Sequence, residues 1–215
     1  MTQRLYLIRH GQADYTSDAR LPTARGVAFD PPLSVTGREQ AAALAERLRH
    51  LTPPAAVYSS TLARARETAH AYADPVGVDV IEREDLCEWY GGGWEFKDFS
   101  QIFDEHPDAL HLFRTQQPAW HLAPEAETGP DFAARARAAI EAILAEHREG
   151  DLYLFVHGGV INAFLAPILG IHGQEMFFLP ANTSINTVLI DEDERRAWFL
   201  SDDAHLTNPE WFGHG

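Results

Sequence analysis

The chain has 215 residues, which fits one domain, because hydrophobic cores usually stop growing at roughly 250–300 residues. Hydrophobic residues make up 45% and charged residues 23%, and these globular values exclude a disordered, collagen-like or coiled-coil chain. The formal net charge of −15 has the wrong sign for neutralising phosphates, so we expect neither nucleic acid nor an anionic membrane as a partner.

The apolar runs and the cysteine content indicate where the protein works. The run from Leu5 to Ile8 is too short for the core of a signal peptide, and no stretch approaches the ~20 apolar residues of a membrane span. Cys87 is the single cysteine, so no intramolecular disulfide can form, which suits a reducing compartment. We expect a cytoplasmic protein in which residues 1–215 form one domain.

The elements of the N-terminal part begin with an apolar strand over residues 4–8. Residues 14–32 contain prolines and a glycine and are expected to form a long loop. The segment 36–39 has the pattern of a capping box, and apolar residues follow at helical spacing. A helix over about 37–50 is therefore predicted.

The middle of the chain alternates strand and helix and is then interrupted. Strands are expected over 56–59 and 78–81, with a helix over about 61–72 between them. Residues 84–130 break this rhythm with three consecutive glycines and many aromatic residues. We interpret this segment as an insertion over the sheet rather than as a second domain.

The C-terminal part again alternates helices and strands, and the whole pattern predicts the fold class. Thr128 begins a long helix that Gly150 ends, and strands are expected over 152–156 and 187–190, with 197–200 as a sixth candidate. Near-continuous apolar strands alternating with helices predict an α/β protein. The expected architecture is a three-layer α/β/α sandwich around a mostly parallel sheet of about six strands, with the insertion over the active site.

Cationic and imidazole side chains follow three of these strands. Arg9 and His10 follow the first, Arg64 lies in the helix after the second, and His157 follows the strand over 152–156. Ligands of parallel α/β sheets bind beyond the carboxyl ends of the strands, so these side chains are expected to converge. Arginines and helix N-termini bind phosphoryl groups, a histidine is a competent nucleophile, and Glu88 is the best candidate for a proton donor.

The same residues carry a resemblance to the histidine phosphatase superfamily, also called the phosphoglycerate mutase-like family. The segment Leu-Ile-Arg-His-Gly-Gln at 7–12 resembles its Arg-His-Gly signature. The match runs from residue 4 to 206 in family order, and one isolated triplet would be far weaker. The further matching segments are 33–41, 58–69, 86–95, 156–161, 182–185 and 203–206.

The resemblance implies a role for each candidate residue. His10 would be the phosphorylated nucleophile and Glu88 the acid and later the base, while Arg9, Arg64 and His157 would hold the phosphoryl oxygens. It implies a phosphomonoester hydrolase that acts on a small phosphorylated substrate, uses no metal and no cofactor, and is compatible with a homodimer.

Two alternatives to hydrolysis stay open on the sequence. A mutase would return the phosphoryl group to another hydroxyl of a bound phosphoglycerate, although such mutases are usually longer than this chain. A non-catalytic phosphate-binding module would need neither nucleophile nor acid. Glu84, Asp85 and Glu95 lie near Glu88 and are rival carboxylates.

Some residues depart from the family pattern. Thr16 stands where many members place a phosphate-holding asparagine, and we leave it outside the site. Phe96 replaces a frequent glycine and is expected to narrow or stiffen the floor of the insertion, and Asn162 also differs from the usual residue. The aromatic residues of the insertion are expected mostly to form a small core of their own. They are Trp94, Phe96, Phe99, Phe103, Phe113 and Trp120.

Overall fold

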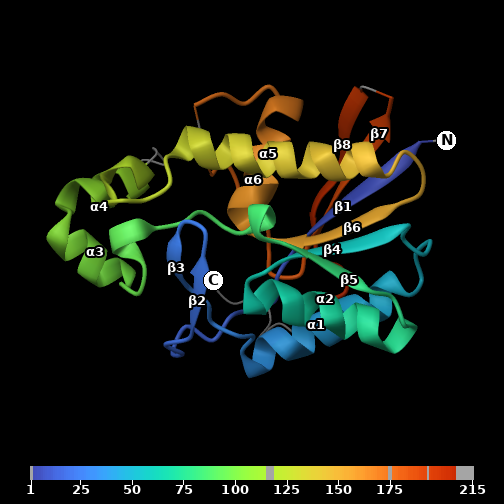
Figure 1. Cartoon of the computed structure of the whole chain (residues 1–215), viewed down its shortest axis with the longest axis horizontal. Coiled ribbons are helices and arrows are strands. Elements are labelled where there is room, and N and C mark those ends of the chain that lie inside the picture. The colour runs from blue at the N-terminus through green and yellow to red at the C-terminus, as the bar shows by residue number, and fades with distance from the viewer. Residues whose placement is uncertain (1, 115–118, 174–175, 193, 207–215) are drawn as a thin grey trace.

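A six-stranded sheet forms the centre of the computed structural model, which describes residues 2–114, 119–173, 176–192 and 194–206 (Figure 1). The strand order is β5-β4-β6-β1-β7-β8. Neighbours from β5 to β1 pair in parallel, whereas β7 runs antiparallel to both β1 and β8. The strands are β1 (Gln3–Arg9), β4 (Ala56–Ser60), β5 (Val80–Arg83), β6 (Leu152–Val156), β7 (Ile185–Asp191) and β8 (Glu194–Asp202).

Helices cover both faces of this sheet, as Figure 1 shows. The helices α1 (Val35–Leu48) and α2 (Ala63–Val76) pack against Tyr6, Ile8 and their neighbours on one face. The helices α5 (Gly129–Glu146) and α6 (Gly158–Ile168) pack against the alternate residues of the same strands on the other face. Successive strand residues point to opposite faces, so the predicted three-layer α/β/α architecture is confirmed.

The helix starts were only partly predicted. Thr128 caps α5, because its hydroxyl accepts a hydrogen bond from the Asp131 amide at 3.2 Å. Helix α1 begins two residues earlier than the proposed capping box, and its N-cap is Ser34, which accepts from the Gly37 amide at 3.0 Å. The predicted start at Thr61 is also shifted, because α2 begins at Ala63 without a side-chain cap.

The stretch 14–32 was expected to be a loop, and this prediction was wrong. It contains a hairpin of β2 (Arg20–Thr23) and β3 (Gly26–Phe29). The hairpin depends on a distant residue, because the Glu95 carboxylate accepts hydrogen bonds from the Phe29 amide at 2.7 Å and from the Gly91 amide at 2.9 Å. Local sequence carries no signal of that contact.

The segment between β5 and α5 forms a helical insertion beside the hairpin (Figure 1). Its elements are η1 (Glu84–Leu86), η2 (Gly92–Trp94), α3 (Phe99–Glu105), α4 (Pro107–Arg114) and η3 (Trp120–Leu122).

The insertion has its own small core. Trp94, Ile102, Ala109 and Ala123 form it, with Phe103 packed against them. The prediction of a satellite core is therefore confirmed for Trp94 and Phe103. The side chains of Phe99, Phe113 and Trp120 lie outside the described residues. No helix in the described ranges is long and apolar enough to cross a membrane.

Candidate active site

The sheet topology brings the predicted site residues to one edge. Arg9 ends β1 and His10 follows it, while His157 follows the neighbouring parallel strand β6 and is the N-cap of α6. The rings of His10 and His157 lie 5.1 Å apart between centroids. Arg64, in the first turn of α2, and Glu88, just beyond η1, line one common cavity. The parallel strands thus place all five predicted residues in one region.

The hydrogen bonds of His10 define its tautomer. Its Nδ1 atom lies 2.7 Å from the Gly11 carbonyl oxygen, which can only accept, so Nδ1 carries the proton. Its Nε2 atom accepts a hydrogen bond from Arg64 Nε at 3.3 Å, so Nε2 has the lone pair. An imidazole held in this way presents one unprotonated nitrogen for attack.

The main chain around His10 is held by residues that sequence reasoning did not place in the site. The His10 carbonyl accepts from Asn182 Nδ2 at 3.0 Å and from the Thr183 amide at 3.2 Å. Thr68 accepts from the Gly11 amide at 3.0 Å and donates to the Arg64 carbonyl at 2.7 Å. The position of Thr68, four residues after Arg64 on the same helix face, was the available signal.

Arg9 has a guanidinium that is only partly engaged. Its Nη1 atom donates to the Pro180 carbonyl at 2.6 Å. Within the described part of the chain, neither Arg9 Nε nor His157 Nδ1 has a hydrogen-bond partner, and both atoms are buried. Buried donors are normally paired, so these two atoms fit the binding of an anionic group with several acceptor oxygens.

The ring of His157 contacts Ser60, which sequence reasoning missed. Ser60 Oγ accepts from the Leu62 amide at 3.2 Å and lies 2.7 Å from His157 Nε2. When the Ser60 hydroxyl donates to Nε2, Nδ1 of His157 carries the ring proton. His157 can then donate from Nδ1 to an oxygen of a bound ligand.

The Glu88 carboxylate lies at the N-terminus of α6. One oxygen accepts from the Gly159 amide at 2.9 Å and the other from the Trp89 amide at 3.0 Å. The rival carboxylates have other contacts, because Glu95 bonds to the Phe29 and Gly91 amides, Asp85 bonds to Arg83, and Glu84 bonds to the Ala24 amide.

Replacing Gly159 with alanine is expected to lower kcat about 10–100-fold, because a Cβ there would lie 2.2 Å from the Glu88 carboxylate oxygen. The carboxylate can swing away, but the buried Phe132 ring, 3.0 Å from the same Cβ, must also shift, so some loss of stability is expected. We would measure kcat and the thermal midpoint. Gly158→Ala is the matched control, since its Cβ would meet nothing closer than 3.5 Å. An equal loss of kcat in both variants would contradict the role of the contact between Gly159 and the Glu88 carboxylate.

Burial and the positive charges of the site keep both histidines neutral. Burial, followed by the guanidinium groups of Arg64 and Arg9, holds the pKa of His10 well below its usual range. Burial, followed by the guanidinium group of Arg64, holds the pKa of His157 well below its usual range. Burial, followed by the charge of Arg47, lowers the pKa of His205 to about 4.

These shifts predict that the free energy of unfolding falls as the pH drops below about 6.5, the pKa of an unfolded histidine. The unfolded chain then binds protons that the folded chain excludes, and the slope is about 1 kcal/mol per pH unit for each histidine. Urea titrations at pH 5.5, 6.5 and 7.5 measure the free energy of unfolding and its slope with pH. The His10→Ala variant should show a slope smaller by one proton, and an unchanged slope would contradict the neutral state of His10.

The cavity that Arg64 and Glu88 line has a volume of about 110 Å³, and Arg9, His10 and His157 are not among its lining residues. Residues of the β2–β3 hairpin form one wall, and the loop from Cys87 to Tyr90 forms another. Its lining residues are Tyr15, Thr23, Arg25, Ala28, Phe29, Leu62, Arg64, Cys87, Glu88, Trp89, Tyr90 and Glu95.

The three departures from the family pattern have structural explanations. Thr16 is exposed and both its amide and its hydroxyl bond to Asp14, so it is not among the residues that line the cavity. Phe96 has a φ of 66° and packs edge-on against Phe29, which ties the insertion to the hairpin. Asn162 accepts from the amides at 177 and 178, and so anchors the segment that leads to the Pro180 carbonyl.

Comparisons with known proteins agree with this geometry. The family model of the histidine phosphatase superfamily (branch 1) matches residues 5–203. A metal-independent phosphoserine phosphatase of Arabidopsis thaliana is 28% identical over 98% of this chain and 86% of that protein. A glucosyl-3-phosphoglycerate phosphatase of Mycobacterium tuberculosis is 33% identical over 78% of this chain and 75% of that protein.

Solved structures share the fold. The native structure of a mycobacterial glucosyl-3-phosphoglycerate phosphatase has a TM-score of 0.78 at 28% identity, covering 94% of this chain and 100% of that chain. The protein YhfR of Bacillus stearothermophilus has a TM-score of 0.80 at 30% identity, covering 94% of this chain and 98% of that chain. The chain belongs to the histidine phosphatase superfamily, branch 1, and is a phosphatase of the histidine type.

Proposed function

We propose that the chain hydrolyses small phosphomonoesters through a covalent phosphohistidine on His10. The Nε2 lone pair of His10 attacks phosphorus, the bond from phosphorus to the ester oxygen breaks, and the Glu88 carboxyl gives its proton to the leaving alkoxide. Arg9, Arg64 and His157 donate hydrogen bonds to the phosphoryl oxygens, whose charge needs cationic donors.

The second step uses the same residues in reverse. The Glu88 carboxylate, now without its proton, takes a proton from water, whose oxygen attacks phosphorus as the bond to His10 Nε2 breaks. Inorganic phosphate leaves, and Glu88 is again protonated for the next cycle. Hydrogen bonding of His10 Nδ1 to the Gly11 carbonyl stabilises the charge of the phosphorylated ring.

The observation that carries this proposal is the orientation of His10. Its proton is on Nδ1, and its unprotonated Nε2 is 3.3 Å from the Arg64 guanidinium. A phosphoryl group bound to that guanidinium would lie next to the attacking nitrogen. The depressed pKa of His10 keeps this nitrogen unprotonated over the neutral range.

The cavity supports a substrate with a small organic group. Its volume of about 110 Å³, its aromatic walls at Tyr15, Phe29 and Tyr90, and the guanidinium of Arg25 fit a compact polar molecule better than a polymer. The relatives named for phosphoserine and glucosyl-3-phosphoglycerate support small phosphorylated molecules as the class to test.

The direct test is to trap the covalent intermediate. The protein is mixed with a phosphomonoester labelled in the phosphoryl group and quenched with base, and the labelled peptide is mapped. We expect base-stable, acid-labile label on His10 together with release of inorganic phosphate in the presence of EDTA. Label on another residue would overturn the proposal, and transfer to phosphoglycerate with a bisphosphoglycerate intermediate would favour the mutase.

A further inference from the structure

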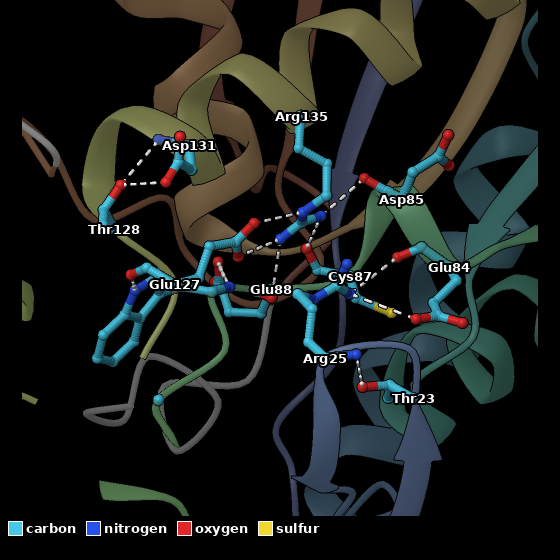
Figure 2. Close-up of polar contacts among 12 residues, drawn as sticks. Thr23, Arg25, Glu84, Asp85, Cys87, Glu88, Glu127, Thr128, Asp131 and Arg135 are labelled. Carbon is cyan, nitrogen blue, oxygen red and sulfur yellow. Dashed lines mark hydrogen bonds and ion pairs between the residues drawn. The ribbon is translucent and has the colours of Figure 1, made fainter. Parts of the chain in front are cut away.

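Arg135 on α5 uses its whole guanidinium to hold one loop and one carboxylate. Its Nη1 atom donates to the carbonyl oxygens of Asp85 at 2.8 Å and Cys87 at 3.0 Å, and Nη2 donates to the Glu88 carbonyl at 3.4 Å. Its Nε and Nη2 atoms each donate to Glu127 at 2.7 Å. A guanidinium has five N–H donors, and these contacts use all of them (Figure 2).

Glu127 links the two ends of the insertion. Its amide donates to the Tyr90 carbonyl at 3.0 Å, and its own carbonyl accepts from Trp89 Nε1 at 2.6 Å. The side chains of Arg135 and Glu127 are only 15% and 8% exposed. Burying two charges is costly unless both are fully paired. This buried pair therefore has one well-defined geometry, whereas an exposed ion pair would exchange between several.

The loop that these residues hold is the one that presents Glu88. Arg135 binds the main chain of Glu88 from α5, and the Gly159 amide binds its carboxylate from α6. Figure 2 shows Arg135 directed at the main chain of Cys87 and Glu88, with Glu127 on its other side. We propose that Arg135, braced by Glu127, is a positioning residue that fixes the 85–88 loop so that the Glu88 carboxyl reaches the leaving oxygen.

This role rests on the proposed function, in which Glu88 is the general acid. Proton transfer requires hydrogen-bond reach to the leaving oxygen, and a displacement of about 1 Å can cost about 100-fold in rate. Lysine has a single nitrogen with three donors and cannot bridge three carbonyl groups and a carboxylate. Arg135→Lys therefore keeps the charge and removes the positioning.

The test compares two substrates that differ in their need for an acid. Ethyl phosphate leaves as a strongly basic alkoxide, whereas p-nitrophenyl phosphate leaves as a weakly basic phenolate that needs no proton. We expect Arg135→Lys to lower kcat/KM for ethyl phosphate at least about tenfold more than for p-nitrophenyl phosphate. Inhibition by inorganic phosphate should change less than about threefold, because the phosphate-binding side chains are untouched.

Two further variants connect the effect to Glu88. Glu127→Gln replaces one of the two oxygens that accept from Arg135 by an amide nitrogen, which cannot accept, and it leaves residues 85–88 unchanged. We expect the same substrate selectivity as in Arg135→Lys, but a smaller one. If Arg135→Lys does not fold, this variant carries the test. In a Glu88→Gln background, Arg135→Lys should change the ratio of kcat/KM for the two substrates less than about threefold, since the group it positions is gone.

Arg195→Lys is the matched control, because Arg195 lies on β8 and pairs with Glu141, which is on the same helix α5 as Arg135. This variant should leave kcat/KM for both substrates unchanged. If Arg135→Lys and Glu127→Gln each lower kcat/KM equally for the two substrates, the positioning role is overturned, although the proposed function stands. The same holds if both variants leave kcat/KM unchanged. If Glu88→Gln lowers kcat/KM equally for both substrates, Glu88 is not the general acid, and this part of the proposed function fails together with the positioning role.

Discussion

Replacing His10 with alanine is expected to lower kcat on p-nitrophenyl phosphate at least about 10⁴-fold, because the attacking nitrogen is removed and no other group takes its place. His10 is buried, and its Nε2 atom faces Arg64. Phosphate release and the amount of trapped phosphoenzyme are measured on the same samples. Both should disappear together.

The His10→Ala variant must also be shown to fold and to bind phosphate. Arg9, Arg64 and His157 remain, so inorganic phosphate should still bind within several-fold of the wild-type affinity. His50→Ala is the control, because the His50 side chain, just past the end of α1, is 76% exposed and contacts the exposed Glu46. Retained phosphoenzyme in the folded variant would show that another residue is phosphorylated.

Replacing Glu88 with glutamine is expected to lower kcat/KM for ethyl phosphate about 10²–10⁴-fold, the usual contribution of a general acid. Glutamine retains an oxygen that can accept from the Gly159 amide, so the loop keeps its place while the transferable proton is lost. Initial rates on ethyl phosphate and p-nitrophenyl phosphate measure the effect. The loss should be much smaller for the aryl ester.

The same variant should separate the two chemical steps. With p-nitrophenyl phosphate the first step needs no acid, but hydrolysis of the phosphohistidine still needs Glu88 as base. We therefore expect a burst of about one nitrophenol per active site, followed by slow turnover. Glu82→Gln, an exposed carboxylate on β5 that pairs with Arg66, is the control. Equal losses on both esters without a burst would exclude Glu88 from both roles.

Much of the sheet could be read from the sequence. The strands over 4–8, 56–59 and 152–156 are short apolar runs flanked by helical patterns, and the structure places each of them at the centre of the sheet. The hairpin at 20–29 could not be read in this way. Its strands have four residues each, one contains a proline, and the Phe29 amide is held by Glu95 from far along the chain.

The residues of the candidate site were likewise only partly predictable from the sequence. Arg9, His10 and His157 stand next to apolar strands, so their place at the sheet edge follows from local pattern and the rule for parallel sheets. Ser60, Asn182 and Arg135 act on partners far from them in sequence, and no periodicity reports such pairs. Only the fold identified them.

The class of the protein, the central strands of its sheet and the side chains that we propose to bind phosphate were thus encoded in local pattern and motif. Hydrophobic periodicity tells which face of an element is buried, and turn residues tell where an element ends. Which carboxylate lies at the N-terminus of α6, and which side chains contact the rings of His10 and His157, depends on hydrogen bonds between remote segments. Those bonds form only when the layers pack, so tertiary structure alone decided them.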